Sequence, residues 1–150
     1  MKRGIFATCL LCVIVICSTA CSFSGTNPTE DLSDEIKPFE NLSDKEISSV
    51  TVELLPPDIK VDLNGEQISE LVAILKTVEI YEEDNSYRDN YGQAVIYSII
   101  KNDGTQLTIM AYNPFIVIND IGYKTKYEPC EELNLLGNTI TETPFGKQVK

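Results

Sequence analysis

Two segments in the first half of the chain alternate strictly between apolar and polar positions. This period of two residues is typical of strands that bury one face. The prolines at 56 and 57 separate the two segments. The pattern therefore predicts two successive short strands, whose apolar members are Val50, Val52 and Leu54, then Ile59, Val61 and Leu63.

The period then changes to that of a helix over residues 65–79. Asn64 is a suitable N-cap, and Gln67 stands three residues later, as in a capping box. Leu63 and Ile68 occupy the positions of a hydrophobic staple. One apolar stripe follows from the helical spacing, and it consists of Ile68, Leu71, Val72, Leu75 and Val78.

A polar, turn-rich stretch at 82–92 predicts a loop, and four apolar segments follow it. The first two are separated by Asn102-Asp103-Gly104, a strong hairpin signal. The last contains two lysines among its tyrosines, which is typical of a strand at the edge of a sheet. We expect a four-stranded meander over residues 93–101, 106–112, 115–118 and 123–127.

A short last helix is expected to begin at Pro129 and to end at Gly137, with a loose polar tail from residue 138. The predicted fold class is thus α+β, a single domain over residues 47–150. One antiparallel sheet, arranged as a meander, carries one main helix on one face and a short C-terminal helix.

The N-terminus has the three-part layout of a secretory signal. Lys2 and Arg3 precede an uncharged, mostly apolar stretch from residue 5 to residue 16, and small residues precede Cys21. A membrane-spanning helix needs about 20 apolar residues, so this stretch is short for a span. A cleaved signal over residues 1–20 is favoured, with an uncleaved membrane anchor as the competing interpretation.

The segment Ser18-Thr19-Ala20-Cys21 resembles the lipobox of bacterial lipoproteins. That resemblance implies a thioether-linked diacylglycerol on Cys21, cleavage after Ala20 and acylation, with palmitate for example, of the new N-terminus. Ser18 departs from the pattern, in which a leucine-like residue is usual. The expected location is the extracytoplasmic side of the cell membrane, where two or three acyl chains anchor stably.

Residues 21–46 are predicted to be a lipidated N-terminus followed by a flexible acidic tether. Their polar composition, with Pro28 and Pro38, offers little apolar surface to bury. One weak helical turn or a docking motif around Ile36 and Phe39 is the alternative.

The charge balance excludes one large class of partners. The chain has 12 basic and 23 acidic residues, and without residues 1–20, which hold Lys2 and Arg3, the net charge is 10 − 23 = −13. Such a surface repels nucleic acids. Histidine is missing from the whole chain, which removes the commonest general base and the usual zinc ligand. We therefore predict no nucleic-acid partner, no cofactor and no metal.

Three features are candidates for chemistry or recognition. Cys130 is the last thiol of a processed chain, and a core position is favoured over a reactive one because Glu131 and Glu132 disfavour a thiolate. The acidic residues of loop 82–89 are either solvated or a calcium site. Tyr87, Arg88 and Tyr91 are of the types that anchor protein interfaces.

The function that these observations favour is display of a non-catalytic binding or accessory module, tethered to the membrane through Cys21. Its partner would be a protein, a peptide or a cell-wall component. A carboxylate-dependent surface enzyme and a cation-dependent sensor are the alternatives. The segment from Leu63 to Leu75 and the hairpin at Gly104 also resemble small domains of Gram-positive lipoproteins, which imply no particular activity.

Overall fold

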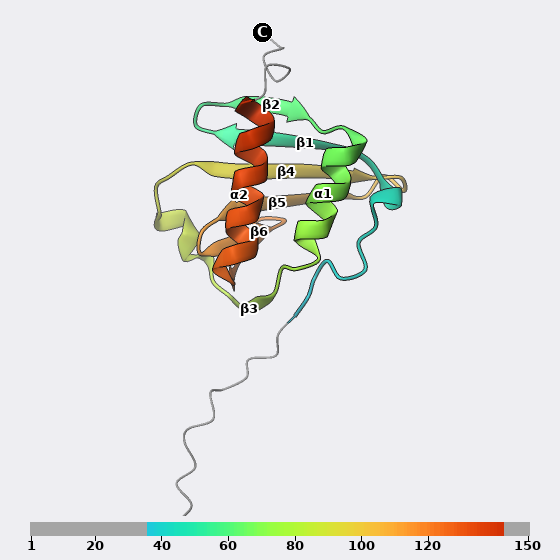
Figure 1. Ribbon diagram of the computed structural model, residues 1–150. Coiled ribbons are helices and arrows are strands. Elements are labelled where there is room, and N and C mark those ends of the chain that lie inside the picture. Colours follow the sequence, from blue (N-terminus) through green and yellow to red (C-terminus); the bar gives the residue numbers. More distant parts are fainter. Residues whose placement is uncertain (1–35, 143–150) are drawn as a thin grey trace, which may run out of the picture. The chain divides into compact units, whose positions relative to one another are not determined.

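One seven-stranded antiparallel sheet with two helices on one face forms the domain (Figure 1). The computed structural model describes residues 36–142. The predicted signal segment 1–20 and the predicted lipid site, Cys21, lie outside the described residues. Within residues 36–142, no helix is long and apolar enough to cross a membrane.

The strands follow the spatial order β2-β1-β4-β5-β6-β7-β3. The predicted α+β class is confirmed, and so is the meander, which is formed by β4 to β7. In chain order the elements are η1 (Asp44–Glu46), β1 (Ile47–Leu55), β2 (Ile59–Asp62), α1 (Gly65–Leu75), β3 (Ile80–Glu83), η2 (Asn85–Asp89), β4 (Ala94–Lys101), β5 (Gln106–Tyr112), β6 (Phe115–Ile118), β7 (Ile121–Thr125) and α2 (Tyr127–Glu142).

The capping box of α1 forms as predicted. The side chain of Asn64 accepts a hydrogen bond from the backbone N–H of Gln67 at 3.0 Å, and the side chain of Gln67 accepts one from the backbone N–H of Asn64 at 2.9 Å. The helix ends at Leu75, four residues before the predicted end. Val78 is nevertheless fully buried, so the apolar stripe continues into the turn that leaves the helix.

The core lies between the sheet and the two helices. Val52, Tyr97 and Ile109 face it from three adjacent strands, and Leu133 faces it from α2; all four are fully buried. The hydroxyl of Tyr97 donates a 2.6 Å hydrogen bond to the backbone carbonyl of Leu133. The whole core lies within residues 36–142, which indicates that a fragment containing them folds by itself.

The prediction that the last helix ends at Gly137 was wrong, because α2 continues to Glu142. Gly137 marks a place where the helix lies very close to the sheet. A Cβ atom there would stand 2.3 Å from a methyl carbon of Val95 and 3.1 Å from the hydroxyl of Tyr97. Close packing therefore requires glycine at this position. The prediction of a loose tail from residue 138 was wrong as far as residue 142, because these residues are helical and Ile140 is buried.

The prediction of a tether as far as residue 46 was also wrong for residues 36–46. Phe39 and Leu42 are only 4% and 6% exposed and belong to the core. Ile36 exchanges two backbone hydrogen bonds with Ile80. The domain thus includes residues from 36 onward, because two isolated apolar side chains find a place in the core.

Strand β3 was not predicted, and it changes which strand lies at the edge. It pairs with β7 and extends the sheet on that side. The segment 123–127 with the two lysines was expected at the edge, but its residues 123–125 belong to β7, which has a neighbouring strand on each side. Only Ile80 of the four β3 residues is buried. The segment therefore has no alternation of apolar and polar residues from which a strand could be predicted.

Candidate functional site

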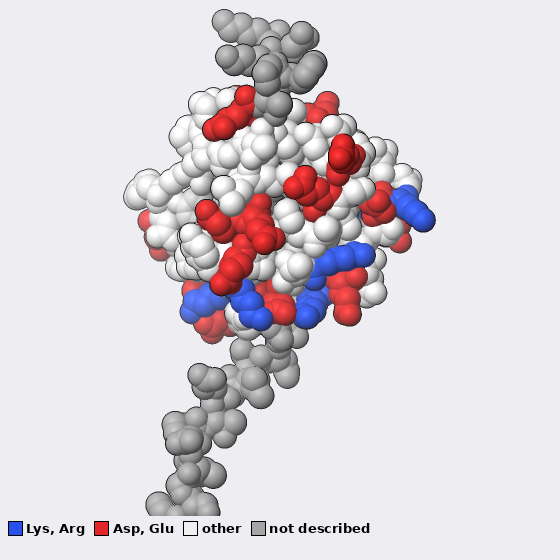
Figure 2. Space-filling model, viewed as in Figure 1, with Lys and Arg blue, Asp and Glu red and all other residues white. Residues whose placement is uncertain are grey.

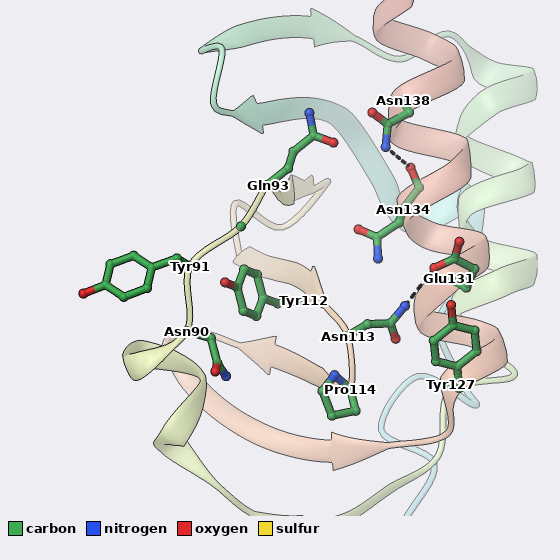
Figure 3. A pocket seen from close by; sticks show the side chains of 11 residues that line it. Asn90, Tyr91, Gln93, Tyr112, Asn113, Pro114, Tyr127, Glu131, Asn134 and Asn138 are labelled. Carbon is green, nitrogen blue, oxygen red and sulfur yellow. Dashed lines mark hydrogen bonds between the residues drawn. The ribbon is translucent and has the colours of Figure 1, made fainter.

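A cleft of about 500 Å³ lies between α2, the β5–β6 turn and the segment that leads into β4 (Figure 3). This volume falls in the range of pockets that bind small ligands. Side-chain amides and tyrosines dominate its walls. The lining residues are Asn90, Tyr91, Gly92, Gln93, Tyr112, Asn113, Pro114, Tyr127, Glu131, Asn134 and Asn138.

Helix α2 supplies one wall through a polar stripe. Tyr127, Glu131, Asn134 and Asn138 are spaced by four, three and four residues, which places them on one face of the helix. The core-facing residues of α2 are offset from this stripe. The contacts of the core-facing residues of α2 with the sheet therefore hold its polar stripe at the cleft.

The opposite wall meets α2 through one hydrogen bond. The side-chain nitrogen of Asn113 donates to a carboxylate oxygen of Glu131 at 2.8 Å, and Figure 3 shows the two groups facing each other. This bond fixes which end of the amide is the nitrogen, because a carboxylate accepts and does not donate. The amide oxygen of Asn113 then points elsewhere.

That amide oxygen is the most unusual atom of the cleft. It is buried and has no hydrogen-bond partner within residues 36–142. Leaving a buried polar atom unpaired costs about 1–3 kcal/mol, and native structures contain few such atoms. A donor brought by a ligand or a water molecule would offset this cost.

Other amides continue the polar lining. The side chain of Asn138 donates to the backbone carbonyl of Asn134 at 2.8 Å, and Asn134 directs its own amide toward the cleft (Figure 3). On the far side, the amide nitrogen of Gln93 donates to the carbonyl of Pro56 at 3.2 Å. Each fixed amide offers a donor and an acceptor a short distance apart.

The three tyrosines differ in their placement. Tyr112 stands in the middle of the cleft and Tyr127 beside Glu131, whereas Tyr91 lies at the rim with its ring directed away (Figure 3). Tyr91 is fully exposed and Tyr127 is 59% exposed. Two ring faces are thus available to a ligand in the cleft, and the third would need to turn inward.

Two residues that the sequence suggested as interface anchors, Tyr87 and Arg88, make local structural contacts in the domain. The hydroxyl of Tyr87 and the guanidinium of Arg88 both donate to the backbone carbonyl of Asp120, at 3.2 and 2.9 Å. The ring of Tyr87 lies against Gly122, where a Cβ atom would come within 2.5 Å of it. These contacts attach η2 to the β6–β7 turn.

Two of the acidic residues of loop 82–89 are engaged with neighbours. Glu82 and Asp84 both pair with Lys124, and the pairing with Glu82 raises the pKa of that lysine. Asp84 also caps η2, and its hydrogen bonds from Ser86 lower the pKa of its carboxyl group. In the described part of the chain, no group of three or more Cys, Asp or Glu residues could hold a metal ion.

Cys130 occupies the core position that the sequence favoured. It is fully buried, and its thiol lies 3.2 Å from the carbonyl oxygen of Phe115. Burial raises the pKa of the thiol to about 12. A thiolate is therefore strongly disfavoured at neutral pH, which argues against the reactive alternative.

Comparison of the chain with protein-family models, curated proteins and solved structures gives no match.

Sequence reasoning missed the cleft residues Asn113, Glu131 and Asn134. A signal did exist, since the polar residues from 127 to 138 have the spacing of one helical face. The predicted helix ended at Gly137 and was judged only by its apolar stripe. The contact between Asn113 and Glu131 joins residues 18 positions apart and depends on tertiary structure.

Proposed function

We propose that this protein is a lipid-anchored module on the extracytoplasmic side of the cell membrane, and that its amide-lined cleft binds a neutral glycan of the cell wall. The observation that carries the proposal is the buried, unpaired amide oxygen of Asn113, held in place by Glu131. No solvent reaches this oxygen in the structure, so a sugar hydroxyl or an N-acetyl amide would donate to it after a shift of the side chains that cover it.

The composition of the cleft favours a carbohydrate over other small ligands. Sugar hydroxyls both donate and accept, and the side-chain amides of Asn113, Asn134 and Gln93 do the same. Tyr112 and Tyr127 add aromatic surface on which the apolar face of a sugar ring can pack. The carboxylate of Glu131 and the net charge of −11 disfavour anionic ligands.

The cleft supports binding rather than hydrolysis. Most glycoside hydrolases use two carboxyl groups, one on each side of the scissile bond. Glu131 is the single acidic residue of the cleft lining, and its carboxylate is already occupied with the amide of Asn113. A second acid would have to come from outside the lining.

The membrane part of the proposal rests on Cys21 and the small residues before it. Wild-type chain and Cys21→Ala are expressed with labelled palmitate. We expect label in the wild type and none in the variant, whereas equal labelling of both would refute lipidation at this residue.

The cleft is tested with the 31–150 fragment and purified peptidoglycan in a co-sedimentation assay. Asn134→Ala removes one amide from the cleft, and Gln106→Ala removes an exposed amide of β5 outside it. We expect Asn134→Ala to weaken sedimentation by about tenfold in affinity, as for the loss of one good hydrogen-bonding group. Gln106→Ala should behave as wild type, and an equal effect of both variants would refute the cleft as the site.

A further inference from the structure

A second depression, about 420 Å³ in volume, runs between α1 and α2 on the side that faces away from the sheet. It is separate from the amide-lined cleft, because the two share no lining residue. We call it the interhelical groove. Its apolar members are Ala73, Ile74, Leu135, Leu136 and Ile140.

Leu135 is the unusual residue of this groove. Its side chain is 58% exposed, although the neighbouring Leu133 and Leu136 are buried in the core. Ala73 is exposed and Ile74 is half-buried on the facing helix. Leu135, Ala73 and Ile74 together give the groove an apolar strip that solvent reaches.

Acidic side chains surround the strip. Glu70 from α1 and Glu132 from α2 line the groove itself. Neither helix contains a lysine or arginine. Figure 2 shows acidic groups across this face, while basic groups gather mainly along its lower part. The acidic residues of the two helices are Glu66, Glu70, Glu128, Glu131, Glu132 and Glu142.

We propose that the interhelical groove docks a cationic amphipathic helix from a partner protein or peptide. Apolar side chains of the partner, spaced three or four residues apart, would cover Leu135 and Ile74. Lysines or arginines at its flanks would meet Glu70 and Glu132. Amphipathic helices bind hydrophobic grooves in this way.

The negative charge of the two helices favours a cationic partner over the other possible occupants of the groove. A second copy of this chain would bring the same acidic helices, and like charges would repel. Anionic lipid head groups are repelled for the same reason. An extended strand would find only side chains here, because the backbone groups of α1 and α2 are engaged within the helices, whereas a helix satisfies its own backbone hydrogen bonds.

The test uses the 31–150 fragment and a synthetic 18-residue peptide of leucine and lysine, with the leucines at helical spacing. A peptide of identical composition, with the leucines scrambled, is the control for charge alone. Binding is followed by fluorescence anisotropy, and helix formation in the peptide by circular dichroism. We expect the patterned peptide to bind about tenfold more tightly than the scrambled one and to become helical on binding.

Variants of the fragment locate the site. Leu135→Ala removes the exposed apolar contact, and Glu70→Gln with Glu132→Gln removes the flanking charges. Both should weaken binding by about tenfold or more, as for a central interface residue. The matched control is Glu40→Gln with Glu46→Gln, an equal loss of charge at exposed positions outside the groove.

Several outcomes would overturn the proposal. One is an equal loss of affinity in the groove and control charge variants, which would show general attraction to an acidic protein. Others are equal binding of the patterned and scrambled peptides, and full affinity in Leu135→Ala. Loss of binding in Asn134→Ala alone would place the peptide in the amide-lined cleft instead.

Discussion

The face of α2 toward the sheet and the face toward the amide-lined cleft differ in what they do for the protein. The face toward the sheet holds Cys130, Leu133 and Gly137, all buried. The face toward the cleft holds Glu131 and Asn134, which are polar and partly exposed. On this helix, the residues that stabilise the fold and the residues that line the cleft lie about a quarter turn apart around the helix axis. Changes on the first face should destabilise the domain, and changes on the second should mainly alter what it binds.

The largest effect is expected from Leu133→Ala. This side chain is fully buried between α2 and the sheet, and a buried Leu→Ala change costs about 2–5 kcal/mol. Urea unfolding of the 31–150 fragment measures the free energy directly. A loss below about 1 kcal/mol would mean that α2 contributes little to the core.

Gly137→Ala comes next. The added methyl group would clash with Val95 at 2.3 Å, and overpacking costs about 1–3 kcal/mol. Replacing glycine inside a helix offsets about 1 kcal/mol of this. We expect a net fall in the melting temperature, measured by circular dichroism, and a rise would show that α2 does not lie this close to β4.

Tyr97→Phe should have a smaller effect. The change removes the hydrogen bond to the carbonyl of Leu133 and keeps the ring in the core. The expected loss in the free energy of unfolding is about 0.5–1.5 kcal/mol. An unchanged urea midpoint would indicate that the hydroxyl adds nothing to the attachment of α2.

The smallest effect on stability is expected from Asn134→Ala, on the other face of the helix. Surface changes of this kind usually stay within about 0.5 kcal/mol. The same variant should bind the glycan about tenfold more weakly. Unfolding and binding are measured on one sample of Asn134→Ala. A destabilisation as large as that of Leu133→Ala would show that the two faces of α2 do not differ in their contribution to stability.

Local periodicity was enough to predict much of the fold. The meander and the capping box at Asn64 depend on residues close in sequence. Gly137 misled because glycine marks both helix ends and close approaches, and only the tertiary contact with Val95 distinguishes them. Phe39 and Leu42 are single apolar residues in a polar segment, so no periodic pattern announced their burial.

The cleft was harder to predict than the fold. It needs α2 to continue past Gly137 and the β5–β6 turn to come against it, and neither follows from local pattern. Asparagine is also common in turns, so Asn113 was interpreted as a turn residue and not as part of a binding site.

Cys130 is the one cysteine between residues 31 and 150, and it lies on the buried face of α2, toward the sheet. An alkylating reagent can therefore reach it only when the helix lifts from the sheet. The rate of labelling, compared with that of an unfolded chain, would report the free energy of that opening in the unaltered protein. The labelling rate of Cys130 thus measures how stably α2, which forms one wall of the cleft, is packed on the sheet.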